Sequence, residues 1–212
     1  MNIITEPYLT QLARWPGQGR HILAQYDASS VIVYQAYRPA IGRFAAQPKY
    51  FGGEFSLSRM SWIKPGFLWM MYRSGWASKP GQEVVLAIRL KRAAYDEILS
   101  QAVPSNCVRE IYGTTENWQQ AVAHSAVRLQ WDPDHDPSGR KVERRAIQLG
   151  LRGTVLARYA RDWIMDIEDI SEFVRQQAMH ADSQDYARLV TPHEAVYHPP
   201  DIEVAMRLGI SG

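Results

Sequence analysis

The hydrophobic positions of this chain form short apolar runs separated by turn residues. The clearest run, residues 31–37, is rich in β-branched and aromatic side chains and contains no glycine or proline, so it predicts a strand. A second strand is predicted over 83–90, after the turn residues Lys79-Pro80-Gly81. Alternation of apolar and polar residues predicts further strands at 127–131, 164–167 and 194–197.

Other segments show helical spacing. Pro39 suits the first turn of a helix through Ala46, and Lys91 to Ala102 places apolar residues on one face. Further helices are predicted over 6–13, 115–124, 153–163 and 170–181. Residues 144–151 fit either a helix or a strand, and 132–139 predicts a polar loop. Strands and helices interleave without a strict βαβ rhythm. We therefore expect an α+β fold: a single compact domain over 1–212, with a curved mixed or antiparallel sheet and surrounding helices.

Residues 59–76 hold three of the seven tryptophans and three of the seven methionines. Lys64-Pro65-Gly66 marks a turn, and the six residues that follow are all large and apolar or aromatic. Six such residues in a row cannot share one face of a surface helix, so the stretch predicts a short buried helix over 65–74 that ends at Gly75, or else a buried strand. We expect Trp62, Trp69 and Met70 to be largely buried.

Cations interrupt this apolar stretch, and an unpaired buried cation is costly. That cost predicts a pocket, in which Tyr37 and Arg38 from the end of the first strand meet Lys64 and Arg73. Aromatic rings with interspersed cations can stack a base and hold its phosphate. We expect the cations to hold a nucleotide phosphate and Tyr37 or Trp76 to stack a base or nicotinamide, with Gln35 beside them.

The composition sets broad limits. The chain has 212 residues, of which 46% are hydrophobic and 22% charged, as is ordinary for a globular protein. Its net charge of +2 is too small to demand a polyanionic partner. The single cysteine, Cys107, excludes an intrachain disulfide. Neither a secretion signal nor an apolar run long enough for a membrane span is apparent, so a cytoplasmic protein is expected.

Two polar segments suggest binding sites. Residues 132–143 place acidic side chains at the spacing of a calcium loop, but Pro137 stands where that loop requires glycine, so we interpret 132–139 as a solvated turn with no metal. Arg144, Arg145 and Arg152 form a basic cluster among glycines. This cluster fits either an anion or nucleic-acid site or a charged surface.

The sequence resembles the family known as domain of unknown function 4291, found in bacteria and fungi. The matching segments are VYQAYRP at 33–39, RMSWIKPGFLWMMYRSGW at 59–76, QWDPDHDPSGRKVERRAIQLGLRG at 130–153 and LVTPHEAVYHP at 189–199. The resemblance covers most of the chain. It implies one domain and brings no activity with it.

A weaker resemblance concerns small ADP-ribosyltransferase-like domains. It is carried by VVLAIRLKRAAYDEIL and TPHEAVY, which look like a strand–helix segment and a terminal strand of those domains. The resemblance implies NAD in the cleft of a split, curved sheet, with Glu194, or else Glu83, as the catalytic glutamate and Tyr37 near the reacting group.

Three functions follow from these observations. The first is a nucleotide-dependent transferase that uses NAD, with an aromatic and cationic cleft. The second is a nucleic-acid-binding module that uses the aromatic residues and the arginine cluster, and the third is a non-catalytic partner-binding protein. The first is favoured because aromatic residues and cations together are typical of a concave site.

Overall fold

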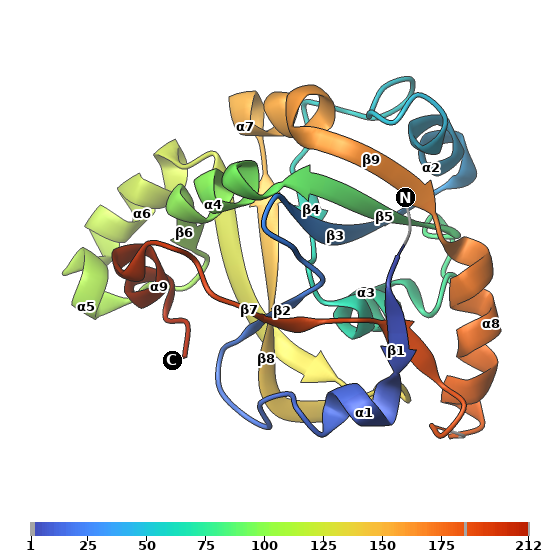
Figure 1. Cartoon of the computed structure of the whole chain (residues 1–212). Helices are drawn as coiled ribbons and strands as arrows, with labels where there is room; N and C mark the ends of the chain where they lie inside the picture. Colours follow the sequence, from blue (N-terminus) through green and yellow to red (C-terminus); the bar gives the residue numbers. More distant parts are fainter. Residues whose placement is uncertain (1–2, 185, 212) are drawn as a thin grey trace.

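The computed structural model describes residues 3–184 and 186–211 (Figure 1). The strands are β1 (Thr5–Pro7), β2 (Ile22–Ala24), β3 (Ser30–Tyr37), β4 (Ser61–Ile63), β5 (Val84–Lys91), β6 (Ala102–Pro104), β7 (Val127–His135), β8 (Lys141–Leu151), β9 (Ile164–Asp169), β10 (Val190–Pro192) and β11 (Ala195–Tyr197). The helices are α1 (Tyr8–Leu12), α2 (Pro39–Ala46), α3 (Phe67–Ser74), α4 (Arg92–Ser100), α5 (Arg109–Tyr112), α6 (Thr115–His124), α7 (Gly153–Arg158), the π-helix η1 (Tyr159–Trp163), α8 (Ser171–Asp182) and α9 (Ile202–Leu208). The expected α+β class is confirmed.

Two larger sheets form the frame. One has the strand order β3-β5-β9 and is antiparallel throughout. The other has the order β4-β8-β7-β6, in which only the β6–β7 pair is parallel. Two short antiparallel pairs, β1 with β10 and β2 with β11, tie the N-terminal segment to the C-terminal segment.

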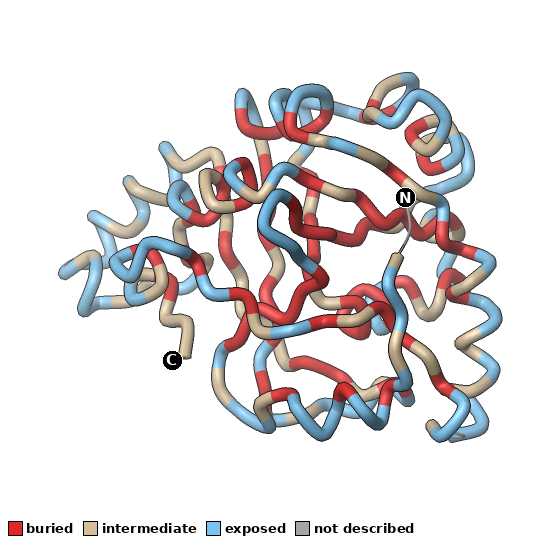
Figure 2. The backbone as a smooth tube through the Cα atoms, in the orientation of Figure 1, coloured by how far each residue is buried: buried red, intermediate tan, exposed pale blue. Residues whose placement is uncertain are grey.

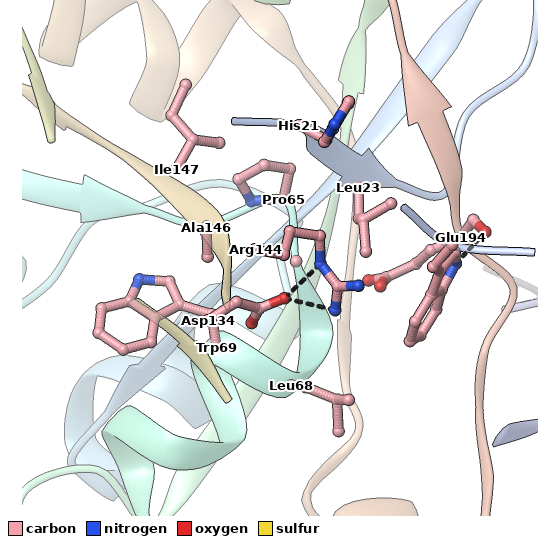
Figure 3. Close-up of a pocket in the computed structure, with 12 residues that line it drawn as sticks. His21, Leu23, Pro65, Leu68, Trp69, Asp134, Arg144, Ala146, Ile147 and Glu194 are labelled. Atoms are coloured by element: carbon pink, nitrogen blue, oxygen red, sulfur yellow. Dashed lines mark hydrogen bonds and ion pairs between the residues drawn. The ribbon is translucent and has the colours of Figure 1, made fainter. Parts of the chain in front are cut away.

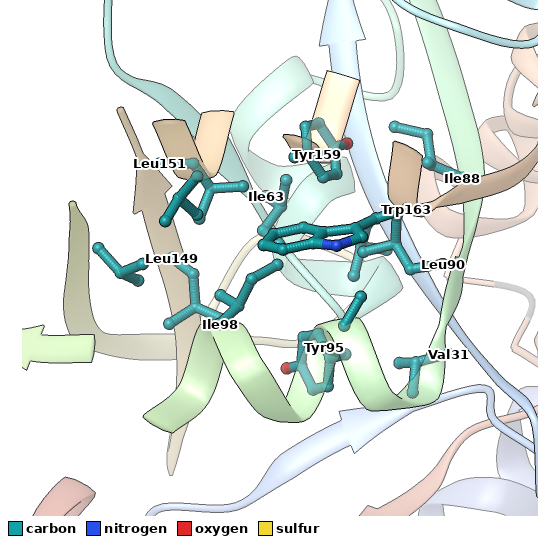
Figure 4. Close-up of a cluster of buried hydrophobic side chains, with 14 of the residues drawn as sticks. Val31, Ile63, Ile88, Leu90, Tyr95, Ile98, Leu149, Leu151, Tyr159 and Trp163 are labelled. Atoms are coloured by element: carbon teal, nitrogen blue, oxygen red, sulfur yellow. The ribbon is translucent and has the colours of Figure 1, made fainter. Parts of the chain in front are cut away.

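Both faces of β3 are buried, which explains its unbroken apolar sequence. Val31 and Val33 belong to one hydrophobic cluster, whereas Ile32 and Tyr34 belong to another on the opposite face. The first cluster fills the space between the two sheets and takes in residues of α4, β8 and η1. Figure 4 shows Trp163 in it, among Tyr95, Tyr159 and aliphatic side chains. The second cluster packs α3 and α8 against the other face.

The two sheets meet at one point. Tyr34 of β3 and Lys64, just after β4, form an isolated antiparallel bridge with backbone hydrogen bonds of 2.7 and 3.2 Å. Beyond this bridge the strands part, and the side chain of Gln35 reaches across to Ser61 and to the carbonyl of Trp62. Helix α3 follows the bridge and contacts β3 of one sheet and β7 of the other. Figure 2 shows the buried backbone concentrated in these central strands and in α3.

The central stretch folds largely as predicted. Helix α3 spans Phe67–Ser74 and ends at Gly75, whose φ of 57° lies in the left-handed region that glycine adopts without strain. Trp69 and Met70 are 5% and 2% exposed, which confirms their predicted burial. Trp62 is buried less completely than these two residues, and it lines a cleft rather than the core.

Several boundaries differ from prediction. The polar loop expected at 132–139 is strand as far as His135, because Asp134 and His135 are buried and continue the pairing of β7 with β8. The ambiguous segment 144–151 is part of β8. The helix expected over 6–13 starts only at Tyr8, and the one expected over 153–163 changes to a π-helix at Tyr159. In the part of the chain described here, no helix has the length and apolar character required to cross a membrane.

Replacement of Trp69 by alanine should lower the free energy of unfolding by about 3–5 kcal/mol, because it deletes a large buried ring from α3. The ring stacks on Tyr72 and His135 with centroid separations of 5.5 and 5.3 Å, and both contacts would be lost. Urea unfolding followed by circular dichroism measures the change. Trp62→Ala, at the half-buried position, is the control and should cost clearly less.

Candidate ligand-binding cleft

A polar cleft of about 510 Å³ opens where the two sheets part. Strands β3 and β4 form one side of it, strands β7 and β8 another, and α3 contributes Trp69, Met70 and Arg73. Gln35 and Tyr37 of β3 line it from the face that is apolar at Val31 and Val33, and Ala36 lines it from the opposite face.

Lys64 lies in this cleft with its side chain largely buried, at 6% exposure. Among the described residues, no hydrogen bond or ion pair holds its amine, although buried amines are normally paired. Burial and, to a smaller extent, the nearby Arg73 lower the pKa of Lys64 to about 8, while Asp132 acts in the opposite direction. Lys64 is therefore a buried cation with no hydrogen-bond or ion-pair partner among the described residues.

Asp132 provides the carboxylate of the cleft. Its two oxygens accept hydrogen bonds from the side-chain amides of Gln130, at 2.9 Å, and Gln148, at 2.7 Å. These amides come from the neighbouring strands β7 and β8, where Gln130 and Gln148 are directly paired. The carboxylate is thus held in a fixed orientation by neutral donors and makes no ion pair with a described residue.

Trp62 forms an aromatic wall because Gly150 leaves room for it. The two residues are cross-strand partners in β4 and β8. A Cβ atom on Gly150 would come within 2.6 Å of the sulfur of Met60 and 3.0 Å of the Trp62 indole. The glycine therefore lets the indole lie close against β8 at the edge of the cleft.

A second cavity of about 370 Å³ adjoins the cleft, and both are lined by Tyr37, Met60 and Ser61. Arg38 belongs to this second cavity rather than to the cleft, and its guanidinium pairs with Glu54. The structure thus brings Gln35, Tyr37, Lys64 and Arg73 together in one cleft, as predicted from the sequence, and places Arg38 in the adjoining cavity.

Glu194 lies in a different place. It lines an enclosed cavity of only about 10 Å³, together with the buried ion pair of Arg144 and Asp134 (Figure 3). Its carboxylate accepts a hydrogen bond of 2.7 Å from the backbone amide of Phe67, at the start of α3. Burial raises the pKa of Glu194 to about 8, against the effect of that amide. Glu194 therefore anchors a helix from inside the protein and does not face the cleft.

The remaining predicted site residues are used elsewhere. Trp76 packs edge-on against Phe67 and donates its indole N–H to the carbonyl of Pro137. Arg144 is buried in its pair with Asp134 at 2.7 Å, so it cannot reach an external polyanion. Arg152 donates to the carbonyls of Ala123 and Ser125 at the end of α6.

Arg145 is exposed and lines a third cavity, beside α9. The three arginines of the cluster therefore do not form one surface.

Comparison with known proteins places this chain in a family. A model described as Domain of unknown function (DUF4291) matches residues 21–197. The chain belongs to this family. The matched range takes in both sheets and every residue of the cleft. No match was found among curated proteins.

Sequence reasoning missed Ser61, Asp132, Gln130 and Gln148. The signal was present for two of them, because Gln130 and Asp132 alternate with Trp131 and so share one face of a strand that continues beyond 131. The proline-rich segment that follows favoured a loop instead. Nothing in the sequence indicates that Gln148 pairs with Gln130.

The buried carboxyl of Glu194 predicts a pH-dependent stability. Its pKa rises from the ordinary 4.5 to about 8 on folding, so between these values the folded state binds one more proton than the unfolded state. The free energy of unfolding should therefore fall as the pH rises from about 5 to 8, by up to about 1.4 kcal/mol per pH unit. Glu194→Gln, which stays neutral, should flatten this slope and raise stability at pH 8.

Urea unfolding at pH 5, 6.5 and 8 measures the slope, with Glu143→Gln, an exposed site on β8, as the matched control. An unchanged slope in Glu194→Gln would contradict the assignment of this proton uptake to Glu194.

Lys64 predicts the opposite dependence. Its pKa falls from 10.5 to about 8 on folding, so burial of the charged amine lowers stability below pH 8, and this loss disappears as the pH rises toward 10.5. Lys64→Met should raise the free energy of unfolding at pH 7 by up to about 3 kcal/mol. The difference from wild type should shrink at pH 10. Lys91→Met, whose amine is exposed and bonds the Asp162 carbonyl, serves as the control.

Proposed function

We propose that the chain is a nucleotide-dependent transferase whose cleft binds a phosphorylated nucleotide, with NAD as the candidate cofactor. The observation that carries this proposal is the unpaired amine of Lys64, buried in a polar cleft beside Arg73. Lys64 and Arg73 form no ion pair with a carboxylate of the described residues, and together they match the charge and donor groups that a phosphate or diphosphate requires. Burial is the main cause of the lowered pKa of Lys64 and repulsion from Arg73 adds to it, so an anion bound between the two cations would relieve that repulsion.

The rest of the cleft suits the remainder of a nucleotide. Trp62, which is partly exposed in the cleft, provides a ring on which a base or nicotinamide can stack. Gln82, Gln130 and Gln148 provide amides for ribose hydroxyls and base edges. The volume of about 510 Å³ lies within the ordinary range of small-molecule sites.

Asp132 takes the role that the sequence suggested for Glu194. In transfer from NAD, the bond between the ribose C1 atom and the nicotinamide nitrogen breaks, and nicotinamide leaves with the electron pair. The acceptor nucleophile then bonds to C1 and loses its proton. A fixed carboxylate beside C1 stabilises the positive charge that develops on the ribose, and Asp132 is the carboxylate that lines the cleft.

Calorimetric titration with NAD, ADP-ribose and ATP tests the binding site, with adenosine as a probe that lacks phosphate. Lys64→Met and Arg73→Gln should each weaken the phosphorylated probes by about 10- to 100-fold, because each removes a charge-assisted hydrogen bond. Adenosine binding should change little. Arg43→Gln is the matched control, because Arg43, like Arg73, is in the last turn of an eight-residue helix.

Wild-type protein that binds none of the phosphorylated probes would contradict the proposed site. Turnover is measured separately as nicotinamide released from NAD, and Asp132→Asn should reduce it without a comparable loss of NAD affinity. Equal turnover in Asp132→Asn and wild type would remove Asp132 from the reaction.

A further inference from the structure

The hydroxyl groups of Tyr37 and Ser61 form a pair at the boundary of the two cavities. Their oxygens lie 2.7 Å apart. The side-chain nitrogen of Gln35 lies 2.8 Å from each of them and 3.1 Å from the backbone carbonyl of Trp62. Both hydroxyl-bearing residues line the cleft and the adjoining cavity.

The orientation of the Gln35 amide follows from its fixed partners. The Trp62 carbonyl can only accept a hydrogen bond, so the amide nitrogen must face it. The amide oxygen then faces Tyr159, whose fully buried hydroxyl donates to it at 2.6 Å. Gln35 therefore presents donors, and no acceptor, to the Tyr37–Ser61 pair.

One of the two hydroxyl protons of Tyr37 and Ser61 has no acceptor among the described residues. The pair carries two hydroxyl protons, and the single contact between the two oxygens uses one of them, whichever residue donates. The other proton cannot go to the Gln35 nitrogen, and no other acceptor within the described residues lies at hydrogen-bonding distance. Removal of the Tyr37 ring from water raises the pKa of its hydroxyl, so the proton stays on the pair near neutral pH.

We propose that the Tyr37–Ser61 pair donates this remaining proton to a proton-free oxygen of the ligand, a phosphoryl or carbonyl oxygen held at the junction of the two cavities. The inference rests on the proposed function, since it concerns the same cleft. The donor is interchangeable between the two residues: Tyr37 donates while Ser61 bonds Tyr37, or Ser61 donates while Tyr37 bonds Ser61. Gln35 is the positioning residue, because its amide nitrogen faces both hydroxyls and cannot accept the remaining proton.

This arrangement predicts an unusual mutational pattern. Tyr37→Phe leaves the Ser61 hydroxyl free to donate outward, and Ser61→Ala leaves that of Tyr37, so each single variant should lose less than about threefold in affinity for NAD. The double variant has no hydroxyl and should lose at least about tenfold, more than the product of the two single effects. Calorimetric titration with NAD and with ADP-ribose measures all four proteins, with circular dichroism as the check on folding.

Two results would contradict the exchangeable donor. In one, a single variant alone loses as much affinity as the double variant. In the other, the fold-loss of affinity in the double variant equals the product of the fold-losses in the two single variants. A loss in the double variant for NAD alone supports the proposal and assigns the nicotinamide carbonyl as the acceptor. A loss for both probes supports it and assigns a phosphoryl oxygen. Should the double variant not fold, Tyr37→Phe/Ser61→Cys replaces it, because a thiol is a weak donor.

The two proposals fail in different ways. If wild-type protein binds neither probe, the proposed function fails. If it binds both probes, and Lys64→Met weakens this binding whereas loss of both hydroxyls does not, the proposed binding site is supported and only the hydroxyl donor is refuted.

Discussion

Tyr34 of β3 and Lys64, the residue that follows β4, exchange two backbone hydrogen bonds. This bridge joins the three-stranded sheet to the four-stranded sheet through the backbone, and beyond it the two sheets are linked by the side chains of Gln35 and Tyr37. Past the bridge, strand alternation places Ile63 in the core between the sheets, whereas Trp62 and Lys64 line the cleft. The position of the Lys64 amine is therefore set by backbone pairing rather than by any partner of its side chain.

Helix α3 begins directly after this bridge, and both of its ends are fixed by side chains. The Glu194 carboxyl accepts the Phe67 amide at the first turn, and Lys79 donates to the carbonyls of Tyr72 and Arg73 at the last. Trp69, Met70 and Arg73 reach the cleft from between these ends. The enclosed cavity around Glu194 thus affects the cleft by holding the helix that forms part of its lining.

The sequence was most informative where local pattern and burial agree. Strands β3 and β5 and helix α3 are dense apolar segments with proline or glycine at their borders, and their predicted positions match the structure within one or two residues. The sequence wrongly predicted a polar loop at Asp134 and His135. Both residues are buried, and Arg144, ten positions after Asp134, neutralises the aspartate across the hairpin. The choice between Glu194 and Asp132 as the carboxylate of the cleft depends on how distant strands pair, which local sequence does not encode.

Among the described lysines and arginines, Lys64 and Arg144 are buried, and they differ in how their charges are paired. Arg144 is neutralised by Asp134 and also donates to the carbonyl of Pro16, so its requirements are met internally. Lys64 has Asp132 nearby, yet the oxygens of that carboxylate are occupied by the amides of Gln130 and Gln148. Neutral donors thus hold Asp132 in place without cancelling its charge.

The cleft consequently contains the Lys64 amine and the Asp132 carboxylate without an ion pair between them. Unpaired charges in a partly dehydrated cleft lower the stability of the fold. A ligand with an anionic group and a centre of developing positive charge would compensate the charges of Lys64 and Asp132 at the same time. A nucleotide whose phosphate lies against Lys64 and Arg73 and whose ribose lies against Asp132 has that distribution of charge. A structural role alone gives no reason for two glutamines to stand where one lysine–aspartate pair would neutralise both charges.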